Sequence, residues 1–260
     1  MASDSERGAS WGNRLSTYFS IRMRKDFNFR RVMETVPALR WLKPKKGERI
    51  LDIGCGEGTY NYRIGLTGAR IIGFDLNRLQ LARAVESHKL PTTGYFCGDA
   101  TQLPVQTGYF DTVMSLCVFE HLPNDKETLK EIWRALRPQG RLLLTLDSLS
   151  LDAVDEAWRT VHKERHAVRQ FYTHQTIEAL MRDCGFKLER YRYLVRSSLD
   201  FALIKLSYTA ERTHPAGALL IRIWLVTIGR FLSAVANLFA PRDRGYTLLV
   251  EATKRDALPT

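Results

Sequence analysis

The sequence ILDIGCGEGT, at residues 50–59, places three glycines at alternate positions directly after an apolar run typical of a β-strand. Glycine permits a tight turn and lets a ligand lie against the backbone. We expect a helix to follow, and the free N–H groups of its first turn attract polar or negative ligands. The stretch therefore predicts a strand, a ligand-binding turn and a helix.

Carboxylates end the next two strand candidates. Asp75 closes ARIIGFD at residues 69–75, 21 residues after Gly54, and Asp99 follows a weaker candidate at 93–98. An acid at the second position can accept hydrogen bonds from both hydroxyls of a ribose. Asp99 can accept from an exocyclic amine such as that of adenine. Either acid alone would more often be a helix cap, but the three features together predict one nucleoside-binding crevice.

The order of the elements predicts an α/β fold. Further strands are expected at residues 110–116 and 140–147, with a helix at 125–136 that ends before the PQG at 138–140. Strands that alternate with helices imply a mostly parallel sheet with helices on both faces. Beyond residue 150 we expect a helix at 173–184 and strands at 186–194 and 246–253. About fifty residues separate those last strands, far more than a hairpin needs.

These motifs resemble those of class I S-adenosylmethionine-dependent methyltransferases of the small-molecule and lipid type. The resemblance covers roughly residues 45–150, and it includes GDA at 98–100, LP at 103–104, FD through EHL at 110–122 and LRPQG at 136–140. It implies a Rossmann-like seven-stranded sheet whose final strands are antiparallel, with S-adenosyl-L-methionine as cofactor. The cofactor-binding residues that it implies are Asp52, Gly54, Cys55, Gly56, Asp75, Leu76, Asp99, Ala100 and Cys117.

A nicotinamide-dependent dehydrogenase shares the first turn and the ribose acid. Its fingerprint wants Gly or Ala where this chain has Thr59, and it asks for no acid after the third strand. Methyltransferases that act on nucleic-acid bases usually carry Asn or Asp followed by Pro-Pro and an aromatic residue after the fourth strand. This chain has CVFE at residues 117–120 instead. We therefore prefer the methyl donor, and we expect no base methylation.

The segment after the fourth strand should lie beside the reactive methyl group. His121 is our candidate for the general base, because an unperturbed histidine has a pKa of about 6.5, and Glu120 is expected to orient it. The alternative is that the pair only supports its loop. Some quinone O-methyltransferases hold a metal ion with a further Glu three residues earlier, but that position is Cys117 here, so we predict no metal. By resemblance, His166, Arg169 and Tyr172 line the acceptor side, unless their segment only anchors the next helix.

The long insertion includes GALLIRIWLVTIGRFLSAVANLFA at residues 217–240. On a helical wheel Arg222, Arg230, Ser233 and Asn237 form one polar stripe against a broad apolar arc. A spanning helix would bury both arginines, whereas a helix in the membrane interface would not. With a partner helix at 198–212, the pattern predicts a hairpin at about 198–241. It would enter a membrane surface, cover an apolar acceptor site, or form a core or dimer contact.

The net charge of +11 is concentrated at the two ends of the chain, with +7 in residues 1–49, +6 in residues 190–260 and −2 between them. This pattern favours contact of the flanks with an anionic surface, and the basic stretch at 22–31 could add attraction to anionic lipid. The alternative is a soluble protein of high pI. We expect a basic helical segment at 1–45 and a methyltransferase domain at 46–260.

Composition completes the prediction. A chain of 260 residues with 45% hydrophobic and 26% charged residues suits a globular α/β protein and excludes a disordered or fibrous one. Four cysteines without CxxC spacing and no apolar leader favour a cytoplasmic location. We predict a methyltransferase acting on oxygen or carbon of an apolar or lipid-like small molecule at an anionic membrane. The alternatives are a soluble small-molecule or RNA acceptor, or a non-catalytic cofactor-binding module.

Overall fold

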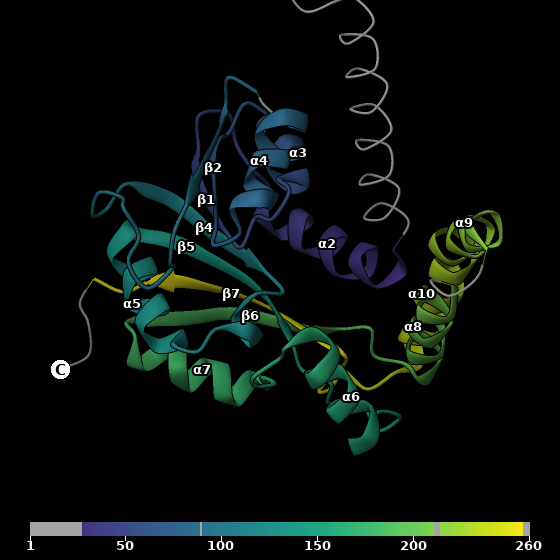
Figure 1. Ribbon diagram of the computed structural model, residues 1–260. Helices are drawn as coiled ribbons and strands as arrows, with labels where there is room; N and C mark the ends of the chain where they lie inside the picture. The colour runs from purple at the N-terminus through teal and green to yellow at the C-terminus, as the bar shows by residue number, and fades with distance from the viewer. Residues whose placement is uncertain (1–27, 89, 211–213, 257–260) are drawn as a thin grey trace, which may run out of the picture.

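A seven-stranded sheet forms the centre of the protein, in a computed structural model that describes residues 28–88, 90–210 and 214–256 (Figure 1). Its strands are β1 (Arg49–Ile53), β2 (Arg70–Asp75), β3 (Thr93–Cys97), β4 (Phe110–Leu116), β5 (Leu136–Asp147), β6 (Phe186–Leu194) and β7 (Thr247–Lys254). Their order is β3-β2-β1-β4-β5-β7-β6, and β7 runs antiparallel to both β5 and β6. The predicted mostly parallel sheet and its antiparallel final pair are therefore confirmed.

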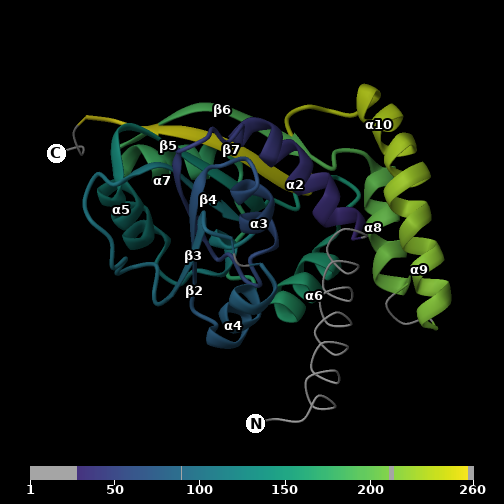
Figure 2. The same cartoon turned by 90° about the horizontal axis from the view of Figure 1, so that it is seen from above.

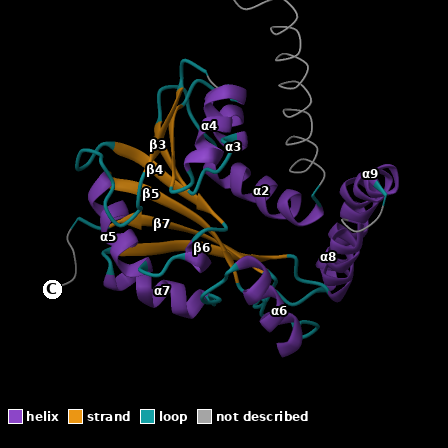
Figure 3. Ribbon diagram, viewed as in Figure 1, coloured by secondary structure: helices purple, strands orange, loops and turns teal. Residues whose placement is uncertain are grey.

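Helices cover both faces of the sheet, as the apolar strands require. One face carries α2 (Phe29–Leu42), α3 (Thr59–Gly65) and α4 (Arg78–Ser87), and the other carries α5 (Asp125–Ala135) and α7 (His174–Asp183) (Figure 3). Successive strand residues face opposite ways, so Ile50 packs in the core on the α2 side and Leu51 in the core on the α5 side. Thr173 caps α7 through a reciprocal bond with Thr176. The strand order reverses between β1 and β4, and open α/β sheets bind ligands at such a point.

The insertion between β6 and β7 is a helical hairpin, as predicted. It contains α8 (Ser198–Ala210), α9 (Pro215–Trp224), a π-helical turn (Leu225–Gly229) and α10 (Arg230–Phe239). Figure 2 shows α9 and α10 continuing each other alongside α8, at the outer edge of the molecule. A further helix, α6 (Glu156–His166), lies beside α8, and the ring centroids of Trp158 and Phe201 are 5.1 Å apart. The hairpin therefore has one side toward the protein and one side away from it.

One predicted boundary was wrong, and the predicted polar stripe divides in the structure. The fifth strand begins at Leu136 rather than at residue 140, because Leu136 pairs with Phe110 across the sheet before the register shifts. In the polar stripe of the hairpin Arg230 is exposed, whereas Ser233 and Asn237 are turned toward the protein. Ser233 is fully buried and Asn237 donates to Asp200 Oδ2 (2.7 Å), because α8 offers hydrogen-bonding partners that are absent from an isolated helix.

The N-terminal segment is only partly described, since residues 1–27 lie outside the described residues. The rest of it, α2, packs against β5 and β7 as part of the main core. Within the basic stretch at 22–31, Arg30 is bonded to Glu34 and Asp147 and is mostly buried. We expected Arg30 to help attract anionic lipid, but these ion pairs make it unavailable for that role. The division at residue 45 stays a prediction.

Candidate active site

A first cavity, of about 270 Å³, lies at the carboxyl ends of β1, β2 and β3. Five of the nine expected cofactor residues line it: Gly54, Asp75, Leu76, Asp99 and Ala100. Sequence reasoning missed the other lining residues, of which Phe74, Val118 and Leu122 offer apolar side chains. Phe74 adjoins the predicted acid, so its position in the strand could have indicated it. The other two come from the segment after β4, whose approach to the glycine turn is a tertiary contact.

The glycine turn has a geometry that only glycine tolerates well. Gly54 has φ 75°, and a Cβ added to it would lie 2.3 Å from Val118 Cγ2. The carboxylate of Asp75 accepts from the N–H of Gly56 (2.8 Å) and from the N–H of Asn77 (2.8 Å). Asp75 thereby ties the turn to the end of β2, and its remaining lone pairs can accept from ribose hydroxyls.

Asp99 closes the third strand in an ionised form. Hydrogen bonds from the backbone and hydroxyl of Thr101 lower the pKa of Asp99 below its ordinary value. A carboxylate at this edge can accept from an amine of a purine ring. The structure thus brings both predicted acids to one cavity.

The other four expected cofactor residues do not line this cavity. Asp52 is buried and interacts with the amide of Asn61 in α3, so it links the end of β1 to the helix that follows the turn. Cys55 is buried, and the N–H of Gly56 donates a hydrogen bond to Asp75. Cys117, with φ 55°, points into a different cavity.

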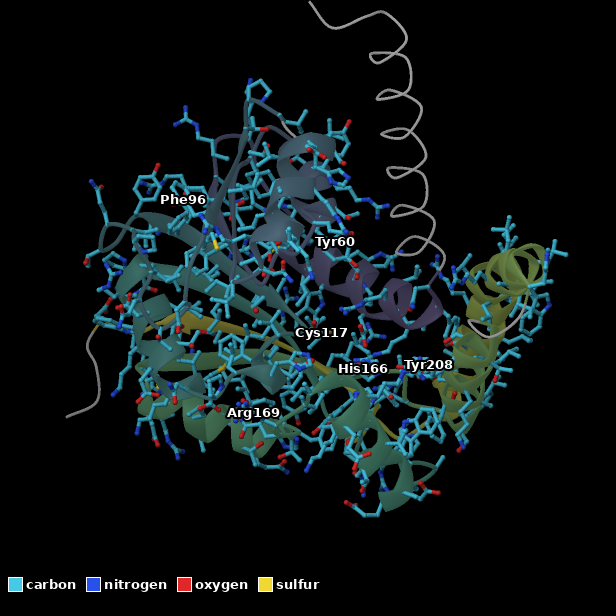
Figure 4. All side chains as sticks on the ribbon, viewed as in Figure 1. Tyr60, Phe96, Cys117, His166, Arg169 and Tyr208 are labelled. Atoms are coloured by element: carbon cyan, nitrogen blue, oxygen red, sulfur yellow. The ribbon has the colours of Figure 1, made fainter. Side chains whose placement is uncertain are left out.

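That second cavity, of about 260 Å³, lies past the ends of β4 and β5. A third cavity, of about 350 Å³, lies between α6 and α8 and is lined by Trp158, Val161 and Lys205 among others. The two share Arg165, His166 and Tyr208, and Figure 4 shows Cys117, His166 and Tyr208 in a row from the sheet to α8. We name the two together the outer chamber. Its wall combines aromatic rings with positive charge.

A buried charged network forms the floor of the outer chamber. Arg30 of α2 donates to Glu34 Oε1 (2.7 Å) and to Asp147 at the end of β5, while His162 Nε2 lies 2.7 Å from the other oxygen of Asp147. Burial raises the pKa of Asp147, but the charge of Arg30 and the contact with His162 outweigh it, so the pKa is lowered. Asp147 is therefore ionised. No sequence signal links Arg30 to Asp147, because they are 117 residues apart.

Glu120 differs from Asp147 in having no partner. It is 1% exposed, and neither oxygen of its side chain has a hydrogen-bond partner among the described residues. Burial, and then the charge of Asp147, raise the pKa of Glu120 well above its ordinary value. Two carboxyl groups in one site thus have pKa values that are pushed apart, an arrangement that is frequent where proton transfer occurs.

The expectation that Glu120 orients His121 was wrong, because no hydrogen bond joins the two side chains. Nδ1 of His121 lies 3.3 Å from the carbonyl oxygen of Ala167 instead. Because a carbonyl only accepts, Nδ1 carries a hydrogen, and in the neutral ring the lone pair is therefore on Nε2. Glu120 and His121 both belong to the 3₁₀ turn Phe119–His121 and both line the chamber, but they do not form a hydrogen-bonded chain.

The three expected acceptor residues separate in the structure. His166 lines both cavities of the outer chamber, and burial followed by the charge of His162 lowers the pKa of His166 to about 4, so it is neutral at pH 7. Tyr172 is buried beneath the chamber, where its hydroxyl donates to Asp125 (2.8 Å). Arg169 is exposed and lies apart from the row in Figure 4. Neither Tyr172 nor Arg169 lines the outer chamber, and the bond to Asp125 directs the side chain of Tyr172 toward α5.

Three potential metal ligands do meet in the floor, namely Glu34, Cys117 and Asp147, whose ligand atoms lie within 4.8 Å of one another. Arg30 already neutralises both carboxylates. Burial, and then the charge of Glu34, raise the pKa of the Cys117 thiol, which keeps it protonated and makes it a poor metal ligand. The prediction of no metal stays a prediction.

Comparison with known proteins identifies the domain. Residues 51–144 match the methyltransferase domain family. These residues form a class I methyltransferase domain. S-adenosylmethionine is its cofactor.

Relatives of the methyltransferase domain differ in what they act on. The malonyl-[acyl-carrier protein] O-methyltransferase of Hahella chejuensis is 31% identical over 143 residues, which are 54% of this chain and 51% of that one. The phthiotriol/phenolphthiotriol dimycocerosates methyltransferase 1 of Mycobacterium ulcerans is 36% identical over 102 residues, 38% and 37% of the two chains. The chain thus spans about half or less of the length of these curated relatives.

A solved structure supports the fold across more of the chain. Phosphoethanolamine N-methyltransferase 2 of Haemonchus contortus, in complex with S-adenosyl-L-methionine, aligns with a TM-score of 0.60 at 20% identity. The alignment covers 85% of this chain and 52% of that one. At this identity the likeness concerns the fold alone.

The residues of the first cavity fit the cofactor of the methyltransferase domain. Its turn is free of side chains at Gly54, where an added Cβ would collide with Val118. Asp75 and Asp99 offer acceptors at successive strand ends, and Phe74 with Leu122 offers apolar surface for a purine. When bound, S-adenosylmethionine supplies a methyl group that is already activated for displacement.

Proposed function

We propose that the chain transfers a methyl group from S-adenosylmethionine to an oxygen or carbon atom of an apolar or lipid-like small molecule, at a membrane surface. We assign the cofactor to the first cavity and the acceptor to the outer chamber. One relative named above is an O-methyltransferase of a malonyl-[acyl-carrier protein], which supports transfer to oxygen, and the other is named for phthiotriol and phenolphthiotriol dimycocerosates, which supports a lipid-like acceptor.

One observation carries this proposal. The segment after β4 forms a shared wall, with Val118 and Leu122 in the cofactor cavity and Glu120 and His121 in the outer chamber. A direct displacement needs the acceptor atom in contact with the methyl group, in line with the sulfur and shielded from water, so the two cavities must open to each other past this segment. A merely cofactor-binding module has no need of the second cavity.

The residues of the chamber suggest separate roles. His121 is proposed as the base, with Nε2 taking the proton of an acceptor hydroxyl while Nδ1 is held by Ala167. Glu120, kept neutral by burial, can donate a hydrogen bond to the acceptor. His166, also neutral, can accept one at Nε2, which now lies 3.4 Å from the hydroxyl of Tyr208.

A soluble acceptor remains the second candidate, and one feature favours it. Helix α8 contributes Lys205 and Tyr208 to the outer chamber, so the insertion already acts as one wall of the acceptor site. In that reading the insertion is chiefly a lid.

We propose a cytoplasmic location, consistent with four free cysteines.

The test uses labelled S-adenosylmethionine with lipid and quinone-precursor extracts as acceptors. We expect label in an organic-soluble product, and the loss of this product in His121→Ala with cofactor affinity unchanged. Label that appears only in water-soluble products would favour the second candidate. Absence of cofactor binding by calorimetry would refute the proposed function altogether.

A further inference from the structure

A groove of about 330 Å³ runs between α2, the end of β6 and α10, away from both cavities described above. Four arginines line it, Arg40 from α2, Arg192 and Arg196 from the end of β6, and Arg230 from α10. Among the described residues no aspartate or glutamate lines it. The rest of its surface is largely apolar and includes Trp41 and Leu238.

The four arginines divide into one that holds the fold and three that are free to bind. Arg196 donates to the carbonyl oxygens of Asn237 and Ala240, which fastens the end of α10 to β6. The pKa of Arg196 is lowered, first by burial and then by the charge of Arg192. Arg40, Arg192 and Arg230 are exposed and form no ion pair within the described part of the chain. Unneutralised positive charge therefore accumulates in this groove.

The outward face of α9 and α10 adjoins the groove and is strongly apolar. Its large exposed hydrophobic side chains are Leu220, Ile223, Trp224, Ile228, Phe231, Leu232, Val235, Leu238 and Phe239. Phe231 is 69% exposed, Leu238 75% and Phe239 86%. Leu238 belongs to both the groove and this face, so charge and apolar surface are continuous. Figure 2 shows that no other described element covers the outer side of this helix.

We propose that this groove binds the phosphate headgroup of an anionic phospholipid while the outward face of α9 and α10 enters the acyl layer beside it. Arginine is suited to phosphate because its planar donors form paired hydrogen bonds. Exposed aromatic and leucine side chains next to cationic residues are typical of helices that lie in the membrane interface. The proposal deepens the membrane part of the proposed function and rests on it only there, since the groove is separate from the methyl-transfer cavities.

A spanning arrangement is the main competitor. Residues Gly217–Phe239 are long and apolar enough to cross a bilayer by length and composition. However, Gly229 and Ser233 face α8 and are buried, and Arg230 would lie near the middle of the bilayer. The structure thus uses one side of this helix for the protein, which leaves only the opposite side for lipid.

The test measures binding of the full chain to vesicles of phosphatidylcholine with and without one-third phosphatidylglycerol. The double variant Arg192→Gln/Arg230→Gln removes two free charges of the groove. We expect its partitioning onto the anionic vesicles to fall by roughly 30-fold, and its weak binding to neutral vesicles to stay unchanged. The matched control, Lys130→Gln/Arg182→Gln, removes the same charge from exposed positions on α5 and α7 and should lose far less.

The apolar half of the proposal has its own signature. Phe231→Ser/Phe239→Ser should weaken binding to both kinds of vesicle. Equal losses in the groove and control double variants would overturn the headgroup site. Resistance of the bound protein to alkaline carbonate would instead show a spanning helix, and salt-dependent binding of an RNA oligonucleotide without vesicle binding would show a different partner. Cofactor affinity, measured in each variant, should be unchanged, so failure of the methyltransferase proposal is seen separately.

Discussion

Replacing Glu120 should reduce methyl transfer but raise the free energy of unfolding, and both effects can be measured. Both oxygens of its buried side chain lack partners, and its neighbour Asp147 is ionised. A buried polar group without a partner costs about 1–3 kcal/mol. Glu120→Met keeps the length of the side chain and removes that cost. We therefore expect the free energy of unfolding to rise by about 1–3 kcal/mol at pH 7, with methyl transfer strongly reduced.

The pH dependence of this gain follows from the raised pKa. A carboxyl whose pKa is higher in the folded state opposes folding increasingly as pH rises from about 4.3, its unfolded value, to the folded value. The advantage of Glu120→Met should thus be smallest at pH 4, grow through that window and then level off.

Thermal unfolding by circular dichroism at several pH values measures both effects. For a domain of this size the gain corresponds to a rise in Tm of roughly 2–10 °C. Glu178→Met, at an exposed position on α7, is the control and should change Tm little. A variant at position 120 that is less stable than the wild type, or whose gain ignores pH, would refute the reasoning.

Three further predictions concern the turn and the floor. Asp75→Ala should weaken S-adenosylmethionine binding by roughly 10- to 100-fold in calorimetry, since it removes charged hydrogen bonds, and an unchanged affinity would exclude the ribose role. Gly54→Ala should lower the free energy of unfolding by about 1–3 kcal/mol more than Gly108→Ala. Both glycines have positive φ, but the added Cβ meets Val118 at 2.3 Å in the first case and its nearest atom at 4.0 Å in the second, so equal losses would contradict the clash. Arg30→Met should cost about 3–5 kcal/mol in urea unfolding at pH 7 because it strands two buried carboxylates. The cost should shrink toward pH 4 as Asp147, which has lost the charge of Arg30, becomes protonated in the variant, and a loss that is constant with pH would point to packing instead.

The cofactor half of the protein could be predicted because its signals are local. The turn at residues 50–59, Asp75 and Asp99 each follow a strand, and parallel strands bring their carboxyl ends to one edge of the sheet. The residues that were missed there, such as Val118, approach the turn only after the chain has crossed the sheet. The same limit explains why Asp52 and Cys55 were assigned to the ligand rather than to the support of the turn.

The acceptor half was decided by tertiary structure. Arg30, Asp147 and Tyr208 come from three distant segments, and the chamber exists only where α2, β5 and α8 meet. Local sequence correctly indicated an amphipathic hairpin from its periodicity. It could not tell which side of that hairpin faces the protein, because the answer depends on Asp200 and the other partners that α8 supplies. Hydrophobic patterning is a property of neighbours in sequence, whereas burial and charge pairing are properties of neighbours in space.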